Sequence, residues 1–173
     1  FKRLNGLNFV FMGDGRNNVA NSLRVACSKM GINFTCCSPK SLWPEKELVD
    51  KCRLIARKND CYVTLTDNVK LGTLNRDVVY TDVWVSMGEA VDFKERIDLL
   101  LPYQINADLL AKTENPNVIV MHCLPAFHDL NTEIGQEIYQ KYGLAELEIT
   151  DAVFQQFSPI IFQEAENRMH SIK

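Results

Sequence analysis

The 173-residue sequence predicts a doubly wound α/β domain, in which an open parallel sheet of about five strands carries helices on both faces. The main observation is that short apolar runs alternate along the chain with stretches of helical periodicity, as in βαβ units. The length fits one domain, and a hydrophobic content of 46% is enough to form a real core. No internal repeat or long linker interrupts this alternation.

The strands are expected where apolar runs are short and bounded by turn residues. These runs cover residues 8–12, 32–37, 62–65, 78–82 and 118–121. The first helix should follow the first strand, because apolar residues recur at spacings of four, three and four up to Met30, and Gly31 suits a left-handed cap. Further helices are expected at 45–58, 67–71, 93–100, 107–113, 132–142 and 151–157, with another starting at 164.

Composition excludes several classes of function. The formal net charge is −3 and the chain contains no lysine or arginine run, so we expect no nucleic-acid partner. No apolar stretch approaches the ~20 residues of a membrane span, and no signal peptide is visible. The six cysteines form no CxxC pair and have no zinc spacing, so we expect no metal site, and their usage fits a reducing compartment such as the cytoplasm. We also expect no cofactor.

The loop after the first predicted strand reads Gly13-Asp14-Gly15-Arg16-Asn17-Asn18. It begins like a dinucleotide fingerprint, but Asn18 stands where the third glycine should be, which counts against nucleotide binding. Asn18 could instead donate its amide to an anion such as a carboxylate, assisted by the start of a helix. From these residues alone, helix capping by Asn17 and Asn18 is the favoured interpretation.

Two further loops also follow predicted strands. Asp82 ends a buried strand, where its carboxylate needs a donor from the protein or from a ligand ammonium group; an Asp turn explains it equally well. Cys123 follows the strand 118–121, but its neighbour His122 should point to the opposite face, which disfavours a Cys–His nucleophile. A buried, inert thiol and a hydrogen-bonded histidine remain the simplest interpretation of this pair.

The three loops share one edge, because the carboxyl ends of parallel strands lie together. Asn18, Asp82 and Cys123 are therefore expected to line one crevice. An amide, a carboxylate and a sulfur would suit a zwitterionic amino acid with a second amine. The amide would meet the α-carboxylate, the carboxylate would meet the α-ammonium group, and the sulfur would lie near the distal amine.

The same residues resemble the ornithine carbamoyltransferase family, over nearly the whole chain as its second, ornithine-binding domain. The motifs that carry the resemblance are GDGRNN at 13–18, DVWVSMGE at 82–89, HCLPAFHD at 122–129 and EAENRMH at 164–170. The resemblance implies transfer of the carbamoyl group of carbamoyl phosphate to the δ-amine of L-ornithine, giving citrulline and phosphate.

For the amino-acid part of ornithine, the resemblance implies two sets of contacts. Asn18 would bind the α-carboxylate with help from the Met87 backbone, and Asp82 and Ser86 would hold the α-ammonium group. The SMG segment that contains Ser86 and Met87 distinguishes ornithine acceptors from aspartate, putrescine or acetylated-ornithine relatives.

For the reacting groups, the resemblance implies that Cys123 and the Leu124 backbone lie at the δ-amine and the carbamoyl group. His122 and Arg168 would contact the carbamoyl phosphate oxygens. From the sequence alone, Arg168 is also explained by an ion pair with Glu164 at i, i+4 spacing on a helix surface.

The resemblance also implies what this chain lacks. Residues 1–173 would form the ornithine-binding domain, because neither the phosphate-gripping Ser-Thr-Arg-Thr motif nor the His-Pro-x-Gln segment of the first domain occurs here, and the family's final helix is missing. The chain alone should then be inactive, while the full enzyme should be a trimer-based homo-oligomer. A binding-only relative and a nucleotide-dependent oxidoreductase are the competing interpretations.

Overall fold

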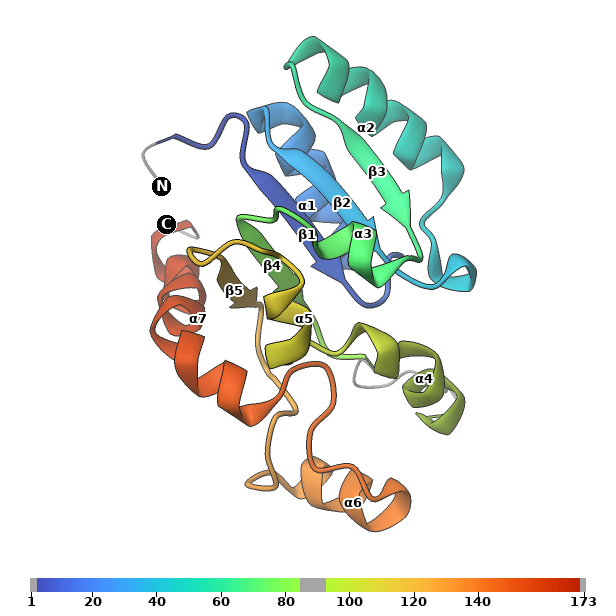
Figure 1. Cartoon of the computed structure of the whole chain (residues 1–173), viewed down its shortest axis with the longest axis vertical. Helices are drawn as coiled ribbons and strands as arrows, with labels where there is room; N and C mark the ends of the chain where they lie inside the picture. Colours follow the sequence, from blue (N-terminus) through green and yellow to red (C-terminus); the bar gives the residue numbers. More distant parts are fainter. Residues whose placement is uncertain (1–2, 85–92, 172–173) are drawn as a thin grey trace.

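The computed structural model describes residues 3–84 and 93–171 and confirms the predicted fold class. Its five strands all run parallel in the order β3-β2-β1-β4-β5 (Figure 1). The strands are β1 Asn8–Met12, β2 Asn33–Cys37, β3 Val63–Thr66, β4 Val78–Thr81 and β5 Ile119–His122. The chain winds outward from β1 in one direction and then returns to place β4 on its other side.

Helices cover both faces of the sheet (Figure 1). They are α1 Asn18–Met30, α2 Lys46–Lys58, α3 Val69–Thr73, α4 Phe93–Leu100, α5 Ala107–Ala111, α6 Glu133–Tyr142 and α7 Asp151–Ser171, with 3-10 turns at Lys40–Leu42 and Leu101–Tyr103. Because side chains alternate along a strand, β1 serves two cores. Phe9 and Phe11 pack with α1 and α2, whereas Val10 and Met12 pack with α5 and α7.

A third apolar cluster lies at the carboxyl end of the sheet. Trp84, which follows β4, packs there with Ile97 of α4 and Ile138 of α6. Figure 1 shows α4 and α6 beyond the points of the strand arrows. These two helices therefore support the loops that leave β4 and β5, which are the loops that carry the candidate site.

Two predictions of helix boundaries were wrong. The short helix α3 begins at Val69 and is capped by Asn68, whose side chain accepts a hydrogen bond from the Leu71 N–H at 3.0 Å, and Asp67 lies outside it. The two helices expected at 151–157 and from 164 are one helix, α7, which continues through Pro159. Proline costs roughly 3 kcal/mol inside a helix. Buried apolar residues of α7 on both sides of Pro159 join the same core, and their packing offsets that cost.

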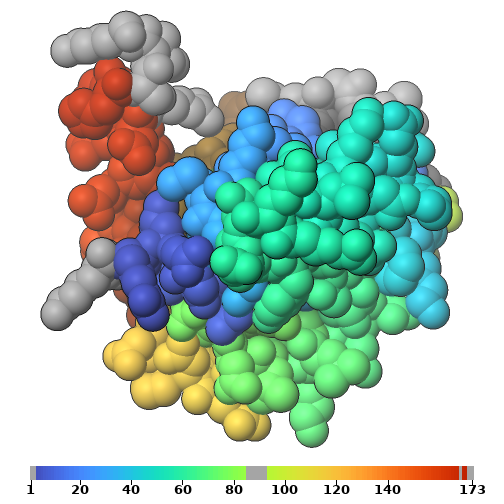
Figure 2. All heavy atoms as spheres, turned by 90° about the horizontal axis from the view of Figure 1, so that it is seen from above, coloured from blue at the N-terminus to red at the C-terminus, as the bar shows by residue number. Residues whose placement is uncertain are grey.

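The last part of α7 extends away from the sheet. Figure 2 shows its atoms standing out from the body of the molecule, and Phe162 and Met169 are 54% and 64% exposed. Within the described residues, no helix combines the length and the apolar character needed to cross a membrane.

Candidate functional site

The candidate site lies where the strand order reverses, between the carboxyl ends of β1 and β4, with β5 beside them. Ligands of open α/β sheets bind at this position, because the loops diverge there and leave a crevice. Asp82 follows β4, Cys123 follows β5, and Asn17 ends the loop between β1 and α1. The sequence reasoning placed its three loops at this edge, and the structure brings them together there.

Asp82 is the centre of the cluster and is only 9% exposed. Its Oδ2 accepts a hydrogen bond from Asn17 Nδ2 at 2.7 Å, and its Oδ1 accepts one from the Val83 N–H at 2.8 Å. The thiol of Cys123 lies close enough to this carboxylate for Asp82 to raise its pKa. Both interpretations of Asp82 apply in part. Its carboxylate accepts from the next backbone N–H, as in an Asp turn, and it also accepts from the side chain of a neighbouring loop.

Asn17 and Asn18 have different surroundings although they are adjacent. The side chain of Asn17 caps α1, because its Oδ1 accepts from the Val19 N–H at 2.7 Å while its Nδ2 is bonded to Asp82. Asn18 is the first residue of α1 and is exposed. Its position at a helix N-terminus, where N–H groups and the helix dipole favour negative charge, suits an anionic ligand group. The capping interpretation therefore holds for Asn17.

The thiol of Cys123 is partly buried and remains protonated at neutral pH. Burial raises its pKa well above the ordinary 9.0, and the neighbouring carboxylates of Asp82 and Glu164 raise it further. A thiol is a nucleophile only as its thiolate. Cys123 therefore offers a neutral sulfur beside a carboxylate, and this agrees with the sequence argument against a covalent nucleophile.

Glu164 of α7 reaches the same cluster from the edge of the sheet. Its Oε1 accepts a hydrogen bond of 2.6 Å from the hydroxyl of Tyr80 in β4, while its Oε2 is buried without a partner among the described residues. Burial raises the pKa of Glu164. Burial and the bond to Glu164 also raise the pKa of Tyr80. Helix α7 is thereby attached to β4 next to the sulfur of Cys123.

His122 lies in the core, where it is 0% exposed. Its Nδ1 accepts from the Leu124 N–H at 2.9 Å, so its Nε2 carries the proton and donates to Oε1 of Glu148 at 3.2 Å. The same carboxylate oxygen accepts from the Phe127 N–H at 2.6 Å. In this structure His122 therefore fixes the path of the loop after β5, including the left-handed Leu124 with φ 51°, and its assigned contact with the carbamoyl phosphate oxygens stays a prediction.

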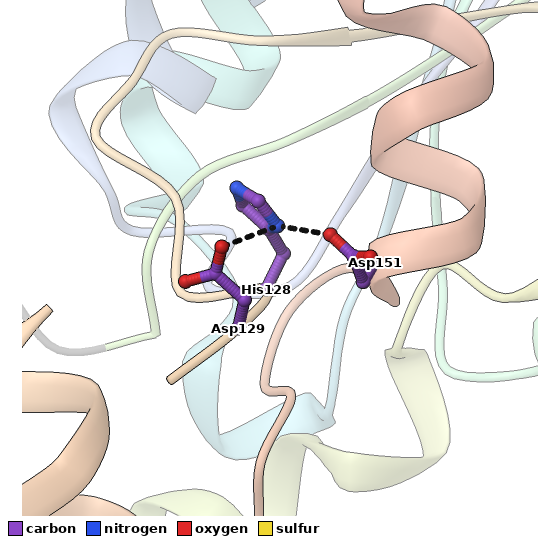
Figure 3. A group of neighbouring side chains, drawn as sticks. All are labelled: His128, Asp129 and Asp151. Carbon is purple, nitrogen blue, oxygen red and sulfur yellow. Dashed lines mark hydrogen bonds and ion pairs between the residues drawn. The ribbon is translucent and has the colours of Figure 1, made fainter. Parts of the chain in front are cut away.

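A second histidine in the same loop makes a different contact. Nδ1 of His128 lies 2.8 Å from Oδ1 of Asp151 and 3.8 Å from Oδ2 of Asp129 (Figure 3), and its ring stacks on Phe154 with centroids 3.7 Å apart. The three polar groups lie within 4.8 Å of one another and could hold a cation. Since His128 already bonds to Asp151, we interpret the group as a link between the loop and the start of α7.

Sequence reasoning missed several residues of this region. Glu148 is fully buried, and the signal that could have found it is a single acid between Leu147 and Ile149. Asn17 was assigned only to capping. Ser86, Met87 and the side chain of Arg168 lie outside the part of the chain that the structure describes, so their assigned roles stay predictions.

An open parallel sheet with converging polar side chains at its switch point defines a doubly wound α/β ligand-binding domain. Residues 5–173 match the family described as "Aspartate/ornithine carbamoyltransferase, Asp/Orn binding domain". The chain belongs to this family.

Relatives of known name agree with this assignment. The chain is 58% identical to an ornithine carbamoyltransferase of Streptococcus mutans over 175 aligned residues, which cover 100% of this chain and 52% of the relative. It is 52% identical to the ornithine carbamoyltransferase of Staphylococcus aureus strain Newman, covering 96% of this chain and 50% of the relative. The chain therefore spans about half the length of the curated relatives that it matches.

Solved structures show the same fold. The ornithine carbamoyltransferase from Pyrococcus furiosus has a TM-score of 0.80 at 31% identity and covers 98% of this chain with 48% of its own. The enzyme from Gloeobacter violaceus has a TM-score of 0.78 at 32% identity, with 98% of this chain and 50% of the other covered. Both matches again involve half of the longer protein.

Proposed function

We propose that this chain is the ornithine-binding half of an ornithine carbamoyltransferase, which transfers the carbamoyl group of carbamoyl phosphate to the δ-amine of L-ornithine and releases citrulline and phosphate. The observation that carries the proposal is the cluster at the switch point, where the Asp82 carboxylate joins Asn17 and Cys123 beside the exposed start of α1. Family membership supports the same reaction.

The α-amino-acid end of ornithine fits the β1–β4 side of the cluster. Asn18 and the first turn of α1 would receive the α-carboxylate, because both supply N–H donors. Asp82 would hold the α-ammonium group, with Ser86 and the Met87 backbone as further predicted contacts. A charged hydrogen bond of this kind contributes roughly 1.5–3 kcal/mol.

The δ-amine would then lie on the β5 side. An amine of this type has a pKa of about 10.4, so it is almost entirely protonated at neutral pH and must lose a proton before it attacks. With Asp82 neutralised by the α-ammonium group, the δ-amine would face the uncharged thiol of Cys123 in a partly buried place, which favours the neutral amine. The Leu124 N–H is engaged by His122, so the Leu124 carbonyl is the backbone group assigned to the amine.

Carbamoyl phosphate would be held mainly by the other half of the enzyme. Arg168 is proposed to stabilise the oxyanion that develops on the carbamoyl group, and such electrostatic stabilisation usually contributes most to the rate acceleration in reactions of this type. For His122, the buried bonds to Glu148 and Leu124 favour positioning of the loop over direct contact with the substrate. Holding both substrates in line supplies the entropic part of the acceleration.

The remaining proposals concern the whole protein. We infer that a first, carbamoyl phosphate-binding domain belongs to the same polypeptide, that the full enzyme forms trimer-based homo-oligomers, and that it works in the cytoplasm. Six free cysteines are compatible with a reducing compartment.

Citrulline formation by the complete gene product tests the function directly, with L-ornithine and putrescine compared side by side at equal carbamoyl phosphate. We expect turnover with ornithine and little with putrescine, since putrescine has no α-carboxylate for Asn18. A folded but inactive product would indicate a binding-only relative, and a preference for putrescine would remove the roles of Asp82 and Ser86. The purified 173-residue chain alone should form no citrulline.

A further inference from the structure

Arg96 of α4 makes two contacts that connect the candidate site to its support. Its Nε donates a hydrogen bond of 2.6 Å to the Trp84 carbonyl, and its second terminal nitrogen forms an ion pair with Oδ2 of Asp14. The side chains of Arg96 and Asp14 are only 10% and 8% exposed. A nearly buried guanidinium thus joins the chain just after Asp82 to the loop between β1 and α1.

The Asp14 carboxylate in turn organises that loop. Its Oδ1 accepts from the Arg16 N–H at 2.8 Å, and the Asp14 carbonyl accepts from the Asn17 N–H at 3.2 Å. On its other side the loop is fixed by Gly15, whose N–H donates to Ser38 Oγ at 3.1 Å. A side chain at Gly15 would come within 2.8 Å of Cys36 Sγ, so the loop has no room to move toward β2.

We propose that the Arg96–Asp14 ion pair is a positioning pair for the amino-acid subsite, a role that rests on the proposed function. The pair acts on Asp82 from two sides. Through Asp14 it holds the loop whose Asn17 donates to the Asp82 carboxylate, and through the Trp84 carbonyl it holds the chain two residues after Asp82. Arg96 sets the affinity for the α-ammonium group without touching the substrate.

An Arg96–Asp14 pair that only stabilised the fold would give a different result when it is removed. Buried ion pairs are often neutral for stability, whereas loss of one partner leaves the other charge uncompensated. If the pair only stabilised the fold, its loss would lower the folded fraction and affect both substrates alike. If it positions Asp82, its loss raises KM for ornithine while KM for carbamoyl phosphate stays constant.

The test compares three variants of the complete gene product. Arg96→Gln removes the charge, and we expect KM for ornithine to rise about tenfold or more, which corresponds to about 1.4 kcal/mol, with KM for carbamoyl phosphate within about twofold. Arg96→Lys keeps the charge but cannot serve both acceptors, so its KM should be intermediate. Lys46→Gln is the matched control, because Lys46 forms an exposed ion pair with Asp50 at 2.6 Å on α2.

Hydrogen exchange supplies a readout that needs no activity. Backbone amides of residues 13–19 should exchange faster in Arg96→Gln than in the wild type and in Lys46→Gln. Unchanged exchange of these amides would overturn the proposal. Because this readout needs no activity, it applies even if the wild type does not use ornithine and the proposed function fails. Faster exchange with an unchanged ratio of the two KM values would show a structural pair and overturn the positioning role.

Discussion

The carboxyl ends of β2 and β4 belong to the same edge of one sheet, but they are built in opposite ways. At the β2 end, Cys36 and Cys37 are fully buried, and a Cβ added to Gly15 or Gly72 would lie 2.8 Å and 2.5 Å from their sulfurs. At the β4 end, Asp82 accepts hydrogen bonds from Asn17 and from the Val83 N–H, and Cys123 of the loop after β5 lies beside it.

The difference teaches where a parallel sheet can bind a ligand. At the β2 end, backbone from two other segments packs on the strand and leaves no volume. At the β4 end the chain reverses its winding, and polar side chains such as Asn17 and Asp82, rather than packed backbone, join the loops after β1 and β4. Substitutions at the β4 end should consequently raise KM for ornithine, whereas substitutions at the β2 end should lower the free energy of unfolding.

The largest effect should follow Asp82→Asn in the complete gene product. The amide keeps the size of the side chain but loses the charge that is proposed to bind the α-ammonium group, so KM for ornithine should rise about tenfold to a hundredfold. KM for carbamoyl phosphate should change little in steady-state citrulline assays. Equal changes in both would contradict the assigned role.

Asp77→Asn is a matched control for this measurement, because Asp77 immediately precedes β4, at its amino end. Its carboxylate accepts from the Asn8 N–H at 2.7 Å and from Asn115 at 3.3 Å. We expect this variant to lose some stability in urea denaturation while both KM values stay at the wild-type level.

Gly72→Ala should produce the reverse result at the β2 end. The new methyl group would meet the Cys37 sulfur at 2.5 Å and its Cβ at 2.8 Å, so the buried strand must shift. Overpacking of this kind costs about 1–3 kcal/mol of the free energy of unfolding. Chemical denaturation measures this loss. A rise in KM for ornithine at unchanged stability would contradict the proposed difference between the two ends.

Cys123→Ala should have a smaller effect, on turnover. The neutral thiol is proposed to position the amine, so its loss should lower kcat about tenfold, the equivalent of one hydrogen bond. Cys37→Ala, at the closed end, should leave kcat unchanged. Complete loss of activity in a folded Cys123→Ala protein would instead indicate covalent catalysis.

The sequence was sufficient to predict the sheet and the edge at which the candidate residues meet. Strand positions followed from short apolar runs, and the convergence of Asp82 and Cys123 followed from the rule that parallel strands end together. These are properties of local pattern and topology. Both predictions hold even where a helix boundary is misplaced by a few residues, as for α3, which was expected from residue 67 but begins at Val69.

Individual contacts at the site could not be predicted in this way. Asn17 and Asn18 are chemically identical, and only the entry angle of α1 decides which of them reaches Asp82. His122 alternates with Cys123 as expected, but its partner Glu148 lies 26 residues further on and is brought to it by tertiary packing. The ion pair of Arg96 with Asp14 spans 82 residues and leaves no local signal.

A last prediction concerns pH and the thiols at the carboxyl ends of the strands. Burial raises the pKa of Cys36 from 9.0 to about 11 and that of Cys37 to about 12, so the folded protein holds these protons more tightly than the unfolded chain. Their contribution to stability is fully present below pH 9 and is lost as the pH rises through 11 and 12.

The free energy of unfolding should therefore fall with pH above 9, by at most about 1.4 kcal/mol per pH unit for each thiol, and the slope should be shallower in Cys37→Ala. Urea denaturation at a series of pH values measures it, and an unchanged slope would contradict the assignment. Because the pKa of Cys123 is raised as well, Cys123→Ala should reduce the slope in the same direction. A raised thiol pKa is then common to the carboxyl ends of β2 and β5. The polar partners of Asp82 distinguish the candidate site from the closely packed end of β2.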